Sequence, residues 1–394
     1  MSKIPHIPER PSGIQHWPTW AFFGLMSLFG RLPYPAIKVL GKGIGLLMYR
    51  LAKSRVRIAT INIQLCFPHL NEQQQAALVR ENLIETGIGM LETSMLWFGG
   101  QRRWSKLVSF KGLEHLDAAL AEGRGGLLLA FHLTSLEIGG SLLGTRYKIG
   151  ALYRRNEDPA IEYAMCKGRS KFVDPIPREA TRDMIKYLKN NQFVWYAADQ
   201  DYGRRQSIFV PFFNIPTATI TATTRFAKLS KSPVIPMTQQ RLSNGTIEVT
   251  IHPPLPNIGN DEEQDALTIN QFLENYLTQH PADYLWVHRR FKTRPSESDA
   301  SLYPEKKKNR PVTPERYKNI IEAADWIEGE PPEKLFVHDE LVYFYYYKGL
   351  LQKSRWKQFI SQLDEQTLDG KTFRYQGKVR HCAHKQCYLV YLQK

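Results

Sequence analysis

The sequence predicts an α/β protein built on a mixed, largely parallel sheet flanked by helices. Between residues 110 and 295, short apolar runs with strand character alternate with segments of helical spacing. Such alternation favours parallel strands, because each helix carries the chain back across the sheet. Polar clusters follow three of the apolar runs, and sites in such sheets collect at the carboxyl ends of strands. A basic helical region precedes this body, and a small α+β module follows it.

The clearest apolar run lies in residues 125–137, Gly-Gly-Leu-Leu-Leu-Ala-Phe-His-Leu-Thr-Ser-Leu-Glu. The glycine pair marks a turn, and the run after it is typical of a buried strand. Thr134 and Ser135 are residue types that cap helices, so a helix is expected to follow them. His132 would then lie at the carboxyl end of the strand, with Glu137 in the first turns of the helix.

His132 and Glu137 are therefore candidates for a general base and its orienting carboxylate. Positions five apart on a regular helix diverge by about 140°, so the two side chains can meet only if His132 precedes the helix. A carboxylate on one imidazole nitrogen orients the ring and favours the cation formed when the other nitrogen takes a proton. Spacing alone leaves open a buried histidine beside an exposed glutamate, because a His-x-x-x-x-Glu pair is common by chance.

Residues 1–60 predict basic helices that associate with a membrane. They carry nine lysines and arginines against one acid, and an uncharged run of about 14 residues ends at Gly30. That run is shorter than the roughly 20 residues of a comfortable span, and no small-residue cleavage site follows it. The next segment has amphipathic spacing with its cations off the apolar stripe, as in helices at anionic interfaces. The stripe consists of Ile37, Leu40, Ile44, Leu47 and Leu51.

A helix packed on the body of the protein would show the same spacing. We favour membrane attachment, at the interface or as one marginal span, with the body on the cytoplasmic side. The formal net charge of +15 indicates an acidic partner, which can be nucleic acid, anionic lipid, or a negatively charged carrier or substrate. Four cysteines in 394 residues do not make a disulfide framework, so a reducing compartment is expected.

The elements of the body are predicted in order along residues 61–300. A turn at Pro68 and Asn71 precedes one long helix or two, after which strands and helices alternate. Helices are expected at 72–98, 113–121, 157–167, 179–190, 221–230 and 261–279, and strands at 126–131, 148–154, 193–198, 234–240 and 247–252.

Polar residues after the second and third of these strands are candidates for substrate contact. Arg154 and Arg155 follow the second strand, and the planar fork of arginine suits phosphate. An ordinary solvated strand end is the alternative. Asp199 and Asp201 follow the third strand and could be taken for a Mg²⁺ pair. We prefer a structural role or a bond to a substrate hydroxyl, because no third carboxylate lies nearby, and we predict no metal site.

Seven motifs, in order over about three fifths of the chain, resemble the late acyltransferases of lipid A biosynthesis, the lauroyl and myristoyl transferase family. One such motif would be weak, but the ordered set is specific. The motifs are Arg-x-x-x-x-Asn-x-x-x-Cys-Phe-Pro at 57–68, Phe-His-x-x-x-x-Glu at 131–137, Tyr-Arg-x-Asn at 153–156, Gly-Arg at 168–169, Trp-Tyr-Ala-x-Asp-x-Asp-Tyr-Gly at 195–203, Phe-Val-Pro-Phe-Phe at 209–213 and Tyr-Leu-Trp-x-His-Arg-Arg-Phe-Lys-Thr-Arg-Pro at 284–295.

The resemblance implies a glycerolipid-acyltransferase-like fold on the cytoplasmic face of a bacterial inner membrane. The enzyme would transfer an acyl group, with the lauroyl type favoured, from acyl carrier protein to a hydroxyl of a 3-hydroxyacyl chain of Kdo2-lipid IVA. It would need no cofactor and bind no nucleic acid. His132 and Glu137 become the expected catalytic pair. Arg169 matches an arginine that the family uses at the active site, and we assign it to phosphate or oxyanion stabilisation.

The expected chemistry is direct attack of the acceptor hydroxyl on the carrier thioester. His132 would take the hydroxyl proton, and backbone N–H groups at the start of the following helix would receive the oxyanion. Two alternatives are an acyltransferase for another lysophospholipid or glycolipid acceptor, and a basic membrane- or nucleic-acid-binding protein with an inactive site. The motifs at 195–203 and 284–295 favour lipid A.

The chain continues for about 100 residues beyond the last family motif. Residues 301–311 predict a charged linker, and residues 312–394 predict a module of unknown role. Its helix and strand signals lie at 314–326, in the aromatic run 341–348 and at 353–363, with strand-like pieces at 372–375 and 387–392. His381, Cys382, His384 and Cys387 could ligate zinc. We prefer an ordinary turn before the last strand, because adjacent strand residues point opposite ways.

Overall fold

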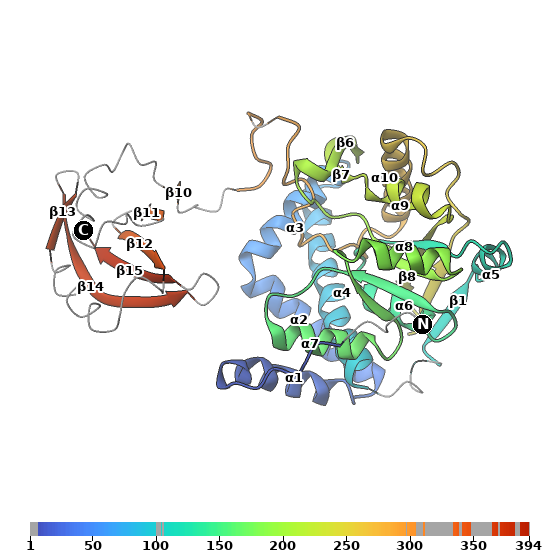
Figure 1. The fold of residues 1–394 in the computed structure, drawn as a ribbon, viewed down its shortest axis with the longest axis horizontal. Helices are drawn as coiled ribbons and strands as arrows, with labels where there is room; N and C mark the ends of the chain where they lie inside the picture. Colours follow the sequence, from blue (N-terminus) through green and yellow to red (C-terminus); the bar gives the residue numbers. More distant parts are fainter. Residues whose placement is uncertain are drawn as a thin grey trace. The chain divides into compact units, whose positions relative to one another are not determined.

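The computed structural model describes residues 7–99, 104, 106–296 and 298–304, and six strands in the region beyond residue 309. The chain divides into two compact units, Met1–Tyr303 and Pro304–Lys394. Residues 1–60 belong to the same unit as the predicted acyltransferase body. Figure 1 shows the elements of both units.

A seven-stranded mixed sheet forms the centre of the first unit, in the order β1-β9-β8-β2-β5-β3-β4. Every neighbouring pair is parallel except β8 and β9. The predicted mixed, largely parallel sheet is therefore confirmed. Its strands are β1 (Val108–Lys111), β2 (Gly126–Ala130), β3 (Ile149–Tyr153), β4 (Asp174–Pro177), β5 (Phe193–Ala197), β8 (Val234–Arg241) and β9 (Ile247–Ile251).

The centre of the sheet is buried on both faces. In β2, Leu127 and Leu129 belong to one hydrophobic core, whereas Leu128 and Ala130 belong to a second. This alternation follows from the two-residue period of a strand and explains why the run is apolar throughout. The α-helices of this unit are α1 (Trp17–Phe29), α2 (Tyr34–Leu51), α3 (Lys53–Cys66), α4 (Glu72–Phe98), α5 (Glu114–Ala121), α6 (Leu136–Leu143), α7 (Pro159–Arg169), α8 (Thr181–Lys189), α9 (Ala222–Ser230) and α10 (Glu262–Gln279).

Helix α4 is fixed at its start by local chemistry. The backbone N–H of Gln74 donates to the Asn71 side chain, and the backbone N–H of Asn71 donates to the Gln74 side chain, both at 2.9 Å. This capping box satisfies two N–H groups that a helix end leaves without partners. The helix then runs for 27 residues and contacts α1, α2, α3, α6 and α7 (Figure 1).

Helix α2 packs on α4 through glycines. A Cβ atom at Gly41 would lie 2.6 Å from the Cα of Ile88, and one at Gly45 would lie 2.3 Å from the carbonyl oxygen of Leu83. Glycine at these positions therefore lets the two helix backbones approach closely.

The predicted apolar stripe of α2 is split between packing and exposure. Ile37 is fully buried, whereas Leu40, Leu47 and Leu51 are exposed. Ten of the thirteen large hydrophobic side chains exposed in the described part of the chain lie within its first 51 residues. Within the described ranges no helix is both long and apolar enough to cross a bilayer. Membrane attachment of this region stays a prediction.

A hairpin of β6 (Ser207–Phe212) and β7 (Ile215–Ile220) also belongs to the first unit. Its two loop residues, Phe213 and Asn214, both have positive φ angles, of 49° and 62°. That is the pattern of a type I′ turn, whose twist matches the flanking strands.

The described part of the second unit is a six-stranded antiparallel sheet in the order β10-β11-β12-β15-β14-β13. The strand-like pieces predicted at 372–375 and 387–392 are confirmed in β14 and β15, and the aromatic run 341–348 contains β12. The segments predicted at 314–326 and 353–363 lie outside the described residues, as does His384. Cys382 and Cys387 face each other in the register of β14 and β15. The strands are β10 (Arg310–Pro311), β11 (Lys334–His338), β12 (Leu341–Tyr347), β13 (Glu365–Leu368), β14 (Lys371–Cys382) and β15 (Cys387–Gln393).

Candidate active site

His132 and Asp199 meet at the carboxyl ends of two neighbouring parallel strands. His132 follows β2, Asp199 follows β5, and these strands pair in parallel register. One carboxylate oxygen of Asp199 lies 2.7 Å from Nδ1 of His132, and the other accepts the His132 backbone N–H at 2.9 Å. The carboxylate therefore holds both the ring and the backbone of the histidine. The predicted position of His132 at the end of the strand is confirmed.

The carboxylate on the ring nitrogen is Asp199 and not Glu137, which corrects the predicted pairing. Glu137 instead accepts two hydrogen bonds from Arg169, one of them from Nε at 3.1 Å, and a third at 3.4 Å from Nε1 of Trp97. Glu137 lies on α6, facing residues at the ends of α4 and α7. Strand β5 is the direct neighbour of β2, so it delivers its carboxylate to the histidine.

The paired carboxylate stays ionised over the whole physiological range. Burial alone would raise the pKa of Asp199, but the charge of His132 and the hydrogen bonds that it donates hold that pKa at about 2. The Asp199 side chain is 2% exposed, whereas that of His132 is 21% exposed. The acid is thus enclosed while part of the imidazole remains accessible.

The loop that carries His132 is braced by the segment 282–288. The Leu285 backbone N–H donates to the His132 carbonyl at 2.9 Å, and the Thr134 N–H donates to the Asp283 carbonyl at 2.6 Å. Two buried amides hold the segment from behind. Asn82 donates to the carbonyls of residues 282 and 284, and Asn62 donates to those of residues 286 and 288. The motifs at 57–68 and 284–295 are therefore joined by hydrogen bonds beside the site.

The Asp201 carboxylate is held by three hydrogen bonds from Thr293 and Gly203. It accepts hydrogen bonds from the Thr293 backbone N–H at 2.6 Å, the Thr293 hydroxyl at 2.7 Å and the Gly203 N–H at 2.9 Å. These bonds tie the exit of β5 to the end of the 284–295 motif, which is the arrangement expected of a structural role.

Arginines occupy the exits of β3 and β4, farther along the same edge. Arg154 and Arg155 are exposed after β3, and Arg178 is exposed after β4. Arg154 lies 3.9 Å from Glu157, and both side chains are largely in solvent, so this pair contributes little. Burial and Asp199 raise the pKa of Tyr202, whereas Arg178 and Arg154 lower it. The Tyr202 hydroxyl therefore lies close enough to interact electrostatically with the Asp199 carboxylate and with the two guanidinium groups.

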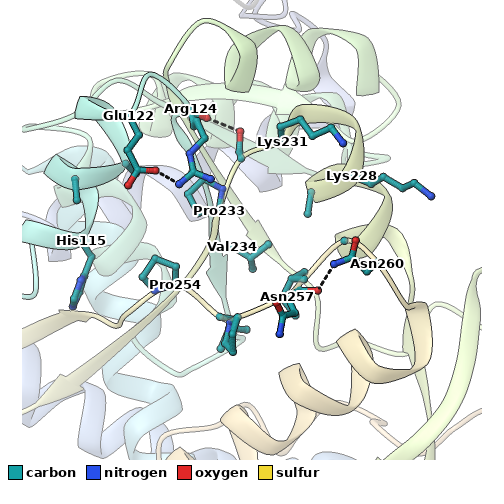
Figure 2. A pocket seen from close by; sticks show the side chains of 18 residues that line it. His115, Glu122, Arg124, Lys228, Lys231, Pro233, Val234, Pro254, Asn257 and Asn260 are labelled. Atoms are coloured by element: carbon teal, nitrogen blue, oxygen red, sulfur yellow. Dashed lines mark hydrogen bonds and ion pairs between the residues drawn. The ribbon is translucent and has the colours of Figure 1, made fainter.

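A cavity of about 480 Å³ lies at the amino ends of β2 and β8, whereas His132 and Asp199 lie at the carboxyl ends of their strands (Figure 2). Arg124, which precedes β2, and Pro233 and Val234, at the start of β8, line it. None of the predicted site residues lines this cavity. Among the described residues, no group of three or more histidine, cysteine, aspartate or glutamate side chains is arranged to hold a metal ion.

Residues 9–293 match a family described as bacterial lipid A biosynthesis acyltransferase. The lipid A biosynthesis lauroyltransferase of Escherichia coli strain K12 is 35% identical over 303 residues, covering 75% of this chain and 98% of the relative. The palmitoleoyltransferase of the same organism is 34% identical over 292 residues, covering 73% and 95%. A lipid A biosynthesis acyltransferase of Haemophilus influenzae is 34% identical over 308 residues, covering 76% and 98%.

Among solved structures, the 1-acyl-sn-glycerophosphate acyltransferase PlsC of Thermotoga maritima matches this chain. It covers 62% of this chain and 96% of its own, with 13% identity and a TM-score of 0.27. Overlap at that level supports no argument, and the likeness to glycerolipid acyltransferases stays a prediction.

Proposed function

This chain belongs to the bacterial lipid A biosynthesis acyltransferase family, and we propose that it transfers an acyl group from acyl carrier protein to a lipid A precursor. The acyl group, of lauroyl type, would go to a hydroxyl of a 3-hydroxyacyl chain of Kdo2-lipid IVA. The observation that carries the proposal is the accessible His132 imidazole held by the buried carboxylate of Asp199. A base so oriented suits proton removal from an alcohol.

The ionised Asp199 carboxylate assigns the proton on the ring. Because it can only accept a hydrogen bond, Nδ1 of His132 carries the hydrogen, and Nε2 is free to act as the base. Nε2 takes the proton of the acceptor hydroxyl as the oxygen attacks the thioester carbonyl. A C–O bond forms, the C–S bond breaks, and the imidazolium returns its proton to the departing thiolate. Asp199 stabilises the cation between these two steps.

Glu137 is proposed to act through Arg169. Their side chains are 16% and 13% exposed, so the pair is shielded from water, and two N–H groups of the guanidinium bind the carboxylate. Glu137 would hold the guanidinium near the start of α6, where Arg169 could stabilise the oxyanion or a substrate phosphate. Arg154 and Arg155 lie exposed on the same edge of the sheet and are the proposed contacts for phosphate or Kdo groups.

The helices α1 and α2 are the proposed contact with the cytoplasmic face of the inner membrane. Their exposed apolar side chains include Phe22, Leu28 and Leu47, which are each more than half exposed. Lysines and arginines between residues 38 and 57 would interact with anionic head groups. An acidic carrier and a phosphorylated acceptor would also be attracted by the net charge of +15.

The function is tested by lipid A mass spectrometry of a strain that lacks the gene. Loss of one secondary acyl chain is expected, and its mass gives the acyl length. Wild type should restore the chain, and His132→Ala should not, since removal of a general base costs about 10²–10⁴-fold in rate. His69→Ala, which changes an exposed histidine in the turn before α4, is the matched control and should complement. Unchanged lipid A with an altered phospholipid profile would instead indicate another acceptor.

A further inference from the structure

A largely buried arginine at the end of β8 has all its hydrogen-bond donors occupied. The Arg241 side chain is 10% exposed, and its five N–H groups make five hydrogen bonds. Nε and Nη2 donate to the two oxygens of Glu92 at 2.8 and 2.6 Å, and Nη1 donates to Glu85 at 2.5 Å. The guanidinium is therefore fixed in position and direction by two carboxylates of α4.

The two remaining donors both end on Thr134, two residues after His132. Nη1 donates to the Thr134 hydroxyl at 3.0 Å, and Nη2 donates to the Thr134 carbonyl at 3.3 Å. The Thr134 N–H is bonded as well, to the carbonyl of Asp283 at 2.6 Å. All three polar groups of Thr134 are thus anchored, two of them to Arg241 and one to the segment 282–288.

Two glutamates and a glycine of α4 face the loop that contains Thr134. Glu85, Gly89 and Glu92 recur at four and three residues, so they lie on one face of the helix. A Cβ atom at Gly89 would lie closer than any contact distance to the Thr134 carbonyl oxygen and 3.2 Å from Nη2 of Arg241. Glycine at this position lets the helix backbone approach the loop.

The network also reaches α2, whose Leu40, Leu47 and Leu51 side chains are exposed. The Tyr34 hydroxyl donates to the Glu92 carboxylate at 2.8 Å. A continuous set of bonds therefore runs from the first turn of α2 through α4 and Arg241 to the loop of His132.

We propose that Arg241 is a positioning residue for the acyl transfer, acting through Thr134 on the loop that presents His132. Glu85 and Glu92 aim the guanidinium, and the guanidinium fixes the loop by its two bonds to Thr134. The inference rests on the proposed function, because it assumes that His132 is the base. Loss of position by about 1 Å at a reacting group can cost 10²-fold in rate, so a weakened loop should lower kcat more than it raises KM.

The test removes one bond to the loop and leaves the ion pairs intact. Thr134→Val deletes the hydroxyl that accepts from Nη1, whereas Thr134→Ser keeps it. We expect Thr134→Val to lower kcat about tenfold with KM within about twofold, and Thr134→Ser to return kcat to near the wild-type value. Thr93→Val is the matched control, because the Thr93 hydroxyl bonds only within α4, to the Gly89 carbonyl at 2.9 Å.

Hydrogen exchange separates this proposal from the assignment of the reaction. In Thr134→Val the backbone amides of residues 131–137 should exchange faster, while those of Thr93→Val should match the wild type. A wild-type chain that transfers no acyl group would remove the proposed function, while faster exchange in Thr134→Val would still support the positioning of the loop. Wild-type exchange together with wild-type kcat in Thr134→Val would overturn the inference.

Discussion

Residues 131–137 are held from a strand side and from a helix side, and the two sides bind different groups of this segment. On the strand side, the Asp199 carboxylate binds the His132 ring and backbone directly. On the helix side, the carboxylates of Glu85, Glu92 and Glu137 bind arginines. A carboxylate that faces the imidazole alone can stabilise its cation, whereas one neutralised by a guanidinium mainly sets geometry. The strand side therefore controls the chemistry of the base, and the helix side controls its position.

Removing the charge on the strand side is expected to have the largest effect. Asp199→Asn keeps the shape of the side chain but offers an amide to Nδ1, so the ring can no longer be held in one tautomer and its cation loses a counter-charge. We expect kcat to fall by about 10²–10⁴-fold. Acyl transfer from a carrier-linked donor to purified lipid acceptor measures this loss.

The control for Asp199→Asn is Asp261→Asn. Asp261 caps α10, accepting hydrogen bonds from the N–H groups of Glu263 and Gln264. Asparagine caps helices about as well as aspartate, so this variant should match the wild type. Near-wild-type turnover in folded Asp199→Asn would show that the carboxylate is not needed to orient or charge His132.

The sequence predicted the strand, the histidine at its end and the acidic residues after the neighbouring strand. It missed the bond between His132 and Asp199, because they lie 67 residues apart and only the order β2-β5 in the sheet brings them together. Glu137 was the nearer candidate along the chain, and nothing in the local spacing revealed that Arg169 would bind it. Arg241 gave no signal either, since its partners Glu85 and Glu92 look like the polar positions of any long helix.

A change on the helix side should cost less and leave the chemistry of the base intact. Glu137→Gln removes the negative charge that Arg169 binds, but it leaves the Asp199 carboxylate bound to His132. We expect kcat/KM to fall by about 10- to 100-fold through misplacement, less than for Asp199→Asn. Acyl transfer by Glu137→Gln and Asp199→Asn, measured side by side with purified lipid acceptor, ranks the two losses.

Arg169→Lys completes the comparison for Glu137. Lysine keeps the charge but cannot make the two parallel bonds of arginine, so Arg169→Lys should lose about as much activity as Glu137→Gln. A loss in Glu137→Gln as large as that of Asp199→Asn would mean that Glu137 acts on the imidazole during turnover, as the predicted pairing requires.

The smallest expected effect concerns Asp283, whose carbonyl accepts from Thr134 and whose carboxyl group accepts from the Tyr276 hydroxyl at 2.9 Å. Burial raises the pKa of Asp283 to about 6, despite the opposing effects of Tyr276 and Arg241. The folded chain therefore binds this proton more tightly than the unfolded chain, whose aspartates titrate near 3.9. The contribution to stability is fully present below about pH 4 and is lost as pH rises through 6.

Asp283→Asn should abolish that loss, because an amide does not ionise. We expect the variant to gain stability relative to the wild type between pH 4 and pH 7, by at most about 3 kcal/mol. Thermal unfolding at several pH values in this window measures the gain. Asp199 does not interfere, because its lowered pKa gives a contribution that is lost only as pH falls toward 2. Equal pH slopes for Asp283→Asn and wild type would show that the pKa of Asp283 is not raised, and that Asp283 is ionised throughout this window.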